Sequence, residues 1–157
     1  MKIVFIIILA IAATVMLLFF ALGMVSWSGE PPGLVDGVLA KCPDKPNCVC
    51  SEYGEDRAHY IDPLPFPPGG QADALPILKS VIEEMGGTVL AARDDYLAAT
   101  FSSAIFRFVD DLEVRVDGAR QQIHIRSASR VGYGDGGVNK RRVERLSELY
   151  TARFSAR

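Results

Sequence analysis

An apolar run near the amino terminus restricts this chain more than any other feature. Residues 3–25 are Ile, Val, Leu, Ala, Phe and Met, interrupted only by Thr14 and Gly23. At a rise of ~1.5 Å per residue, a helix of this length extends ~34 Å, enough to cross a ~30 Å hydrocarbon core. A buried core helix of this length does not suit so small a chain. We therefore expect residues 1–25 to form a transmembrane anchor.

A cleaved secretory signal is the alternative interpretation of this run. Signal peptides have an apolar core of ~7–15 residues followed by a small-x-small cleavage site. Here the run is longer, and the nearest candidate site, Ala21-Leu22-Gly23, lies within it. Lys2 precedes the run and Glu30 follows it, and positive charge tends to stay in the cytoplasm. The amino terminus is thus predicted inside and the remaining chain outside, with Trp27 at the membrane interface.

The remaining ~130 residues are enough for one domain with its own core. The net charge of −2 gives no field that would attract nucleic acid, so no nucleic-acid partner is expected. Residues 26–37 are rich in glycine and proline and are predicted to be a linker, which leaves residues 38–157 as the domain. Its last 20 residues form a basic helix, predicted to be a solvated face, with contact to anionic lipid or an envelope protein as the alternative. The basic residues there are Lys140, Arg141, Arg142, Arg145, Arg153 and Arg157.

Three cysteines lie close together in a proline-rich segment. Outside the cytoplasm a disulfide is favoured, and either Cys42–Cys48 or Cys42–Cys50 would close a short loop. The spacing lacks the C-x-x-C pairs of zinc and redox sites, so neither a metal nor another cofactor is expected. Because proline is dense throughout residues 38–70, we expect this segment, which we call the strap, to wrap the domain with little regular structure.

The rest of the chain predicts an α+β domain. Apolar residues recur at three- and four-residue steps in 73–85, with Asp73 as a possible cap, Pro76 in the first turn and Gly86 as the stop. Four strands are expected at 88–92, 96–102, 105–116 and 121–129, and a closing helix at 139–154. This order, helix-strand-strand-strand-strand-helix, favours an antiparallel four-stranded sheet packed by two helices.

The hairpin between the last two strands can be paired in more than one register. A four-residue loop, 117–120, pairs Val114 with Ile123, whereas a two-residue turn pairs Val114 with Gln121. The first keeps apolar side chains together and is preferred. It places Asp111 opposite Arg126 and Glu113 opposite His124 on an outward face. Asp110 then lies opposite Ser127 on the inward face.

This register gathers polar side chains at one end of the sheet. A buried network of ion pairs and hydrogen bonds is the simplest interpretation. A sharper hypothesis is a pocket in which Arg126 and Arg130 bind an anionic group, because the planar guanidinium suits carboxylate or phosphate. Catalysis by Asp110 and Asp111 is less favoured, since adjacent strand residues point to opposite faces. The set comprises Arg107, Asp110, Asp111, Arg126, Ser127, Ser129 and Arg130.

A glycine-rich segment, 131–139, follows the last strand. It contains Tyr133, Asp135 and Asn139, and its backbone N–H groups could meet an anion at the start of the last helix. It matches neither the P-loop nor the dinucleotide-binding pattern. The plainer interpretation is a tight turn with Asp135 or Asn139 capping that helix. The first interpretation adds these three residues to the candidate ligand-binding set.

Several motifs together resemble the family of domains of unknown function numbered 1499, over roughly residues 38–155. The resemblance implies a domain found in bacteria and photosynthetic lineages, but no reaction. The family tends to have serine at the position of Cys50, which favours Cys42 and Cys48 as the disulfide. The motifs are Cys42-Pro43, Asn47-Cys48-Val49, residues 106–111, residues 126–133, Asp135, residues 137–139 and Arg141.

These observations together predict a single-pass protein of the bacterial inner membrane with a periplasmic domain. Its predicted role is a binding or assembly module for an anionic small molecule or lipid, or for an envelope protein. The alternative is a hydrolase that uses Asp110 or Asp111 together with Arg126 and Arg130.

Overall fold

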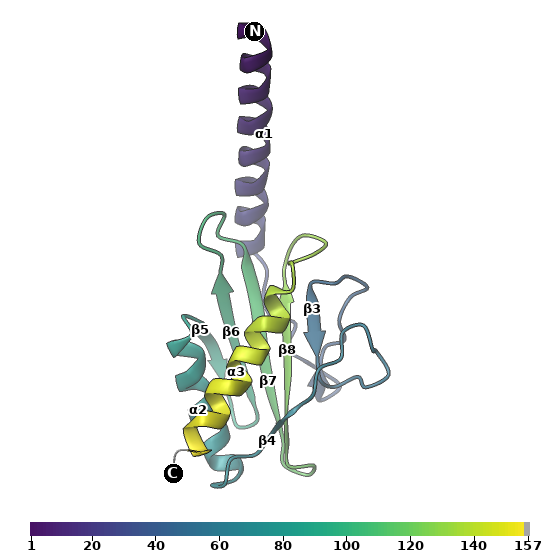
Figure 1. Ribbon diagram of the computed structural model, residues 1–157. Coiled ribbons are helices and arrows are strands. Elements are labelled where there is room, and N and C mark those ends of the chain that lie inside the picture. The colour runs from purple at the N-terminus through teal and green to yellow at the C-terminus, as the bar shows by residue number, and fades with distance from the viewer. Residues whose placement is uncertain (156–157) are drawn as a thin grey trace.

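The computed structural model describes residues 1–155, so the predicted basic residue Arg157 lies outside the described part. One long helix, α1 (Lys2–Trp27), rises from the domain, and two further helices cover one face of a sheet (Figure 1). These are α2 (Gln71–Glu84) and α3 (Val138–Ser155). The strands are β1 (Leu34–Val35), β2 (Val38–Leu39), β3 (Cys48–Cys50), β4 (Leu64–Pro65), β5 (Thr88–Ala92), β6 (Tyr96–Ser102), β7 (Val109–Asp117) and β8 (Gln122–Ser129).

Helix α1 is apolar along its length, and only Gly23 and Ser26 are buried within the molecule. The large side chains of α1, such as Ile3 and Leu17, are exposed. Among the described residues it is the one helix long and apolar enough to cross a membrane, a test that anchors and signal sequences both meet.

The main sheet is antiparallel, as predicted, but it has six strands instead of four. β5 to β8 are neighbours in chain order, and β3 and β4 both pair with the outer edge of β8. The strap has little regular structure, as expected, but it contributes three short strands, β2, β3 and β4. Cys48 and Cys50 alternate with Val49 as strand residues do, and β4 tolerates Pro65 because it lies at an edge.

The predicted hairpin register was wrong by two residues. Val114 lies opposite Ile125, and Asp110 lies opposite Ser129 instead of Ser127. The loop has four residues, as predicted, but it starts one residue later. Asp117 remains in the strand opposite Gln122, and its carboxylate accepts the N–H of Arg120. Both registers keep apolar residues on one face, so the alternation of apolar and polar residues alone does not distinguish the two registers.

Two smaller boundaries also differ from the sequence prediction. β7 begins at Val109 instead of residue 105, because Arg107 has a positive φ of 59° and ends the extended conformation before it. Helix α2 begins at Gln71, so Asp73 lies within its first turn and does not cap it. Pro76 consequently stands beyond the first turn, inside the helix.

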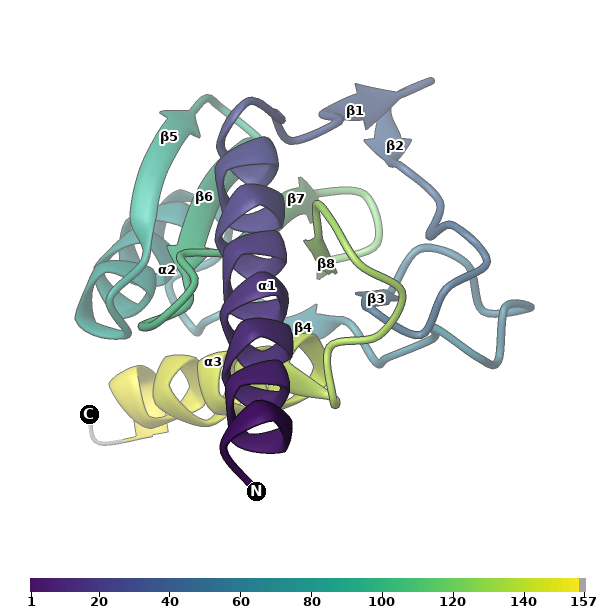
Figure 2. The same cartoon turned by 90° about the horizontal axis from the view of Figure 1, so that it is seen from above.

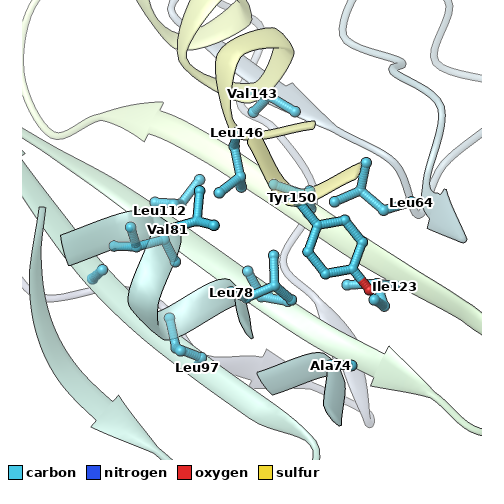
Figure 3. Close-up of a cluster of buried hydrophobic side chains, with 14 of the residues drawn as sticks. Leu64, Ala74, Leu78, Val81, Leu97, Leu112, Ile123, Val143, Leu146 and Tyr150 are labelled. Atoms are coloured by element: carbon cyan, nitrogen blue, oxygen red, sulfur yellow. The ribbon is translucent and has the colours of Figure 1, made fainter. Parts of the chain in front are cut away.

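The main core lies between the sheet and the two helices, as Figure 3 shows. Leu78 and Val81 from α2 and Leu146 and Tyr150 from α3 are completely buried against the sheet. The side chain of Tyr150 reaches the strap, where its hydroxyl donates to the carbonyl of Pro65 at 3.3 Å. Burial of these apolar side chains removes them from water and stabilises the two-layer arrangement.

The opposite face of the sheet is also covered, which corrects the expectation that it points outward. Residues 28–37 and the strap lie over it, and Leu39, Cys48 and Ala128 pack there in a second cluster. Asp111 and Glu113, predicted to be outward, are 4% and 0% exposed. The predicted Cys42–Cys48 disulfide is confirmed, and Cys50 is a buried free thiol.

Candidate functional site

The carboxyl-terminal end of α1 is built into the domain through close backbone and side-chain contacts. A Cβ added to Gly23 would lie 2.0 Å from the carbonyl oxygen of Phe106, so only glycine allows this approach. The Ser26 hydroxyl accepts the N–H of Val109, the first residue of β7, at 3.0 Å. Trp27 donates its indole N–H to the carbonyl of Arg107 at 2.8 Å. These contacts form a joint between the helix and the sheet.

Aromatic side chains extend this joint along α1. Phe106 lies 5.0 Å from Phe19 and 5.3 Å from Phe20, measured between ring centroids. Phe108 lies 6.2 Å from Phe19 in an edge-to-face arrangement. Such aromatic pairs add ~0.5–1.5 kcal/mol beyond the area that they bury. The β6–β7 loop is therefore packed along the last turns of the helix.

Arg130 connects the joint to the sheet face that the strap covers. Its guanidinium binds the Asp111 carboxylate, with a shortest N–O distance of 2.7 Å, and its Nη1 donates to the carbonyl of Ser26 at 3.1 Å. The sequence prediction paired Asp111 with Arg126 instead, as a result of the register error. Because the same guanidinium binds Asp111 of β7 and the Ser26 carbonyl of α1, Arg130 is one of the residues that fix α1 to the domain.

Glu113 is the most enclosed charged residue of this face. Its carboxylate accepts the Tyr96 hydroxyl and the Gly33 N–H, each at 2.8 Å, and pairs with Arg126 at 3.0 Å. Burial raises the pKa of Glu113, and the hydrogen bonds and the Arg126 charge oppose that rise. One nitrogen of the guanidinium, Nε of Arg126, has no partner among the described atoms. The Arg126 charge is thus already neutralised by a buried carboxylate.

A third ion pair continues this row toward the far end of the sheet. Arg115 holds Glu52 of the strap through two hydrogen bonds, at 2.6 and 3.1 Å. His124 lies 3.6 Å from the same carboxylate and 3.2 Å from the Ser51 hydroxyl. Burial lowers the pKa of His124, which therefore favours the neutral imidazole. The Glu52 carboxylate thus fastens the strap to the sheet through Arg115.

The helix-covered face carries a separate polar cluster at the end of the sheet nearest α1. Asp110 pairs with Arg142 of α3 at 2.6 Å, and Arg142 also donates to the Ser127 hydroxyl at 3.0 Å. Ser127 and Arg142 both donate to the side-chain oxygen of Asn139. Asp110 and Asp111 thus point to opposite faces of the sheet, and each is bound to a different arginine.

Asn139 links four elements of this cluster. Its side-chain nitrogen donates to Ser129, to the backbone carbonyl of Asn47 and to the carboxylate of Asp135, at 2.9–3.0 Å. Asp135 also accepts the backbone N–H groups of Gly137 and Asn139 and so caps α3, as the plainer interpretation predicted. Although burial raises the pKa of Asp135, these hydrogen bonds outweigh it and lower that pKa overall. The glycine segment is held by its own side chains.

A cleft of about 480 Å³ opens beside the joint, on the face of the sheet opposite α2 and α3. It is lined by Trp27, Glu30 and Arg130, together with Arg107 of the β6–β7 loop. The guanidinium of Arg107 is exposed and makes no ion pair within residues 1–155. Of the three arginines at this end of the sheet, Arg107, Arg126 and Arg130, only Arg107 has no carboxylate partner within residues 1–155.

The predicted site residues consequently fall into three groups. Arg107 and Arg130 line the cleft at the joint, and Asp111 lies behind Arg130. Arg126 is enclosed with Glu113. The remaining residues lie together under α3, with one exception. Tyr133 lies on the glycine segment and is 72% exposed. The residues of this third group under α3 are Asp110, Ser127, Ser129, Asp135 and Asn139.

Sequence reasoning missed the residues that complete these groups. Ser26, Glu52 and Arg142 each lie far along the chain from their partners. Of these three, only Arg142 could have been connected to the site from the sequence. Residues 139 and 142 are three positions apart, so they lie on the same face of the last helix. Ser26 gave no such signal, since a serine at the end of an apolar run is ordinary.

The chain belongs to the family described as "Protein of unknown function (DUF1499)", whose model matches residues 38–149. The resemblance predicted from the cysteine, arginine and glycine motifs is thereby confirmed. The match begins at the first residue of β2 and ends within α3, so it includes the sheet and excludes α1. A search of the curated proteins found no match.

Proposed function

We propose that this DUF1499 member is a membrane-anchored binding module that contacts anionic lipid head groups at the periplasmic face of the bacterial inner membrane. In this proposal residues 1–25 are the anchor, residues 26–37 connect it, and residues 38–157 form the binding domain. The observation that carries the proposal is the joint at Gly23 and Ser26. A signal sequence is removed from the mature protein, whereas here Gly23 of the candidate cleavage site packs against the β6–β7 loop, and Ser26 just after it binds the first residue of β7.

The disulfide supports a location outside the cytoplasm. A Cys42–Cys48 bond persists in an oxidising compartment, and Lys2 before the apolar run favours a cytoplasmic amino terminus. Alkaline phosphatase, which needs its own disulfides, should be active when fused after residue 157. Green fluorescent protein at the same position should be dark after export through the general secretory route. A fluorescent fusion with inactive phosphatase would contradict this topology.

Arg107 supports an anionic ligand. It is exposed at the cleft beside Trp27, a residue type that prefers the membrane interface. Arginine binds phosphate through a planar set of donors, and a basic side chain near an anionic surface contributes ~1 kcal/mol. Glu30 also lines the cleft, so the site combines one free cation with a carboxylate at its rim.

Native mass spectrometry of the full chain released from nanodiscs tests this ligand. Phosphatidylglycerol should remain bound more often than phosphatidylcholine, and Arg107→Gln should lower its occupancy about fivefold, the equivalent of ~1 kcal/mol. Arg120→Gln is the matched control, because that arginine is 72% exposed in the β7–β8 loop at the far end of the sheet. Equal loss in both variants would contradict a specific contact at Arg107.

The joint itself can be tested by hydrogen exchange in nanodiscs. Gly23→Val should push α1 away from Phe106 and speed exchange in peptides that cover residues 103–110, which include the Val109 N–H. Ala21→Val changes an exposed position of the same helix and should leave that exchange unchanged. Identical exchange in the two variants would show that the joint does not hold the helix.

The arrangement gives little support to the hydrolase alternative. Asp110 and Asp111 lie on opposite faces of β7, and each carboxylate is bound to an arginine at 2.6–2.7 Å. A general base must reach a substrate proton within hydrogen-bond distance. Neither carboxylate is free for that role, so we do not carry catalysis into the proposal.

A further inference from the structure

We propose that a second cavity, between α1 and the glycine segment, receives the end of one acyl chain from a lipid of the surrounding leaflet. This inference rests on the membrane anchorage proposed above, but not on the head-group contact of Arg107. The cavity has a volume of about 240 Å³ and lies on the other side of β7 from the Arg107 cleft, with Val109 lining both.

The walls of this cavity are largely apolar, and besides Val109 of β7 their apolar side chains come from four parts of the chain. Phe19 and Leu22 belong to α1, Phe108 to the β6–β7 loop, Val131 to the glycine segment and Val138 to the first turn of α3. Because two of the wall residues belong to the apolar run itself, the cavity is continuous with the part of the chain that would contact lipid. A water-soluble ligand would have to reach it past this apolar surface.

The polar side chains that line the cavity already have partners. Asp110 pairs with Arg142, and the Ser129 hydroxyl accepts a hydrogen bond from Asn139. The Ser103 hydroxyl accepts the N–H of Phe108.

The fourth polar side chain, Asp135, is likewise satisfied. It binds the backbone N–H groups at the start of α3. With these hydrogen-bonding groups engaged by the protein, an incoming molecule gains most from burying apolar surface, which favours a hydrocarbon chain.

The position of the cavity fits a lipid source. The β6–β7 loop and the glycine segment both rise beside the lower end of α1, one on each side of it (Figures 1 and 2). Each loop exposes a large side chain, with Ile105 67% and Tyr133 72% exposed. Exposed apolar and tyrosine side chains beside a membrane helix are expected at the interface. The entrance of the cavity would therefore lie at the interface, where the head groups meet the lipid chains.

The size of the cavity limits what it can hold. Pockets that enclose whole drug-sized ligands have volumes of ~300–1,000 Å³, so 240 Å³ suits only part of a chain. The rest of the lipid would remain in the leaflet. The domain would then be held at the membrane by both the helix and an inserted lipid chain.

Photocrosslinking of the full chain in nanodiscs tests this inference. The probe is phosphatidylglycerol that carries a diazirine in one acyl chain, and adducts are mapped by peptide mass spectrometry. Wild-type protein should give adducts on both α1 and residues 131–138. Leu22→Trp, or Val138→Phe as an independent second variant, should fill the cavity and reduce the adducts on residues 131–138 at least fivefold. Met24→Trp is the control, because Met24 is 60% exposed and does not line the cavity.

The outcomes separate this inference from the proposed anchorage. Adducts on α1 without adducts on residues 131–138 would leave the anchor intact and overturn the acyl-chain site. Adducts on residues 131–138 that persist in both cavity-filling variants would mean surface contact only, and would also overturn it. Failure to label α1 itself would instead overturn the anchorage on which the inference rests.

Discussion

The two faces of the six-stranded sheet are stabilised by different interactions. The face under α2 and α3 is packed mainly by apolar side chains such as Leu112 and Leu146. The opposite face carries a row of ion pairs, Arg130–Asp111, Arg126–Glu113 and Arg115–Glu52, beneath the strap and residues 28–37. The apolar face holds the domain together. On the ionic face, these pairs act together with the smaller apolar cluster that includes Leu39 and Cys48 of the strap.

This difference extends to the contacts of α1. Arg130 of the ionic face binds the carbonyl of Ser26, while Phe106 and Phe108 pack against the apolar side of α1. The joint thus combines both kinds of interaction within two helical turns. The hydrogen bond is directional and restricts the orientation of the helix, and the aromatic contacts add apolar packing.

The largest expected effect comes from breaking the most enclosed ion pair. Glu113→Ala leaves the Arg126 guanidinium, the Tyr96 hydroxyl and the Gly33 N–H without their partner. Loss of one member of a buried pair costs ~3–5 kcal/mol. Thermal unfolding of the full chain in detergent micelles should show a correspondingly lower midpoint.

A double substitution sharpens this comparison of the faces. Glu113→Leu combined with Arg126→Met removes both charges and should recover most of the lost stability, because apolar replacement of a buried pair is often neutral. If the double variant is as unstable as Glu113→Ala, the ionic face depends on these charges themselves and not on their mutual satisfaction.

A cavity in the apolar face should have a slightly smaller effect. Leu146→Ala removes a completely buried side chain from the contact between α3 and the sheet. Such substitutions cost ~2–5 kcal/mol. Unlike Glu113→Ala, this loss should not be recovered by changing a neighbouring charge. Leu149→Ala, at a partly buried position of the same helix, serves as the control and should cost less.

The smallest expected effect is a pH dependence confined to the ionic face. Burial lowers the pKa of His124, so the unfolded chain binds a proton more readily than the folded chain. Stability should therefore fall as the pH drops below the ordinary value of ~6.5, by at most ~1.4 kcal/mol for each pH unit. Glu113, whose pKa burial raises, acts in the opposite direction at lower pH.

His124→Gln isolates this contribution, because it leaves Glu113, Glu52 and Arg115 in place. Unfolding midpoints measured at pH 7.5 and 5.5 should differ less in this variant than in the wild-type protein. If the midpoint changes equally with pH in both proteins, the His124 imidazole is not the group that causes the pH dependence.

The apolar face could be predicted from the sequence, and the ionic face could not. Alternation in β7 and β8 marks one set of residues as buried, and the helix periodicity supplies what covers them. On the other set, charged residues such as Glu113 and Arg115 have the pattern of a solvent-exposed face. Nothing local indicates that the strap and residues 28–37 fold back over them, because those contacts join residues 63 to 80 positions apart.

The candidate site was predictable to a similar extent. The sequence places Arg107, Asp111 and Arg130 near one end of the sheet, which the structure bears out at the joint. It gave no indication that Ser26 and Gly23 complete that joint, since small residues within an apolar run usually indicate only a helix. The register error arose because a shift by two residues keeps the same faces and changes only the partners.

The central claim is that α1 stays attached to the domain and is not removed after export. Intact-mass measurement of the protein purified from native membranes tests this most directly. We expect the mass of a chain that retains the whole apolar run, with at most the initiator methionine missing. A mature chain that starts at residues 24–26 would contradict it.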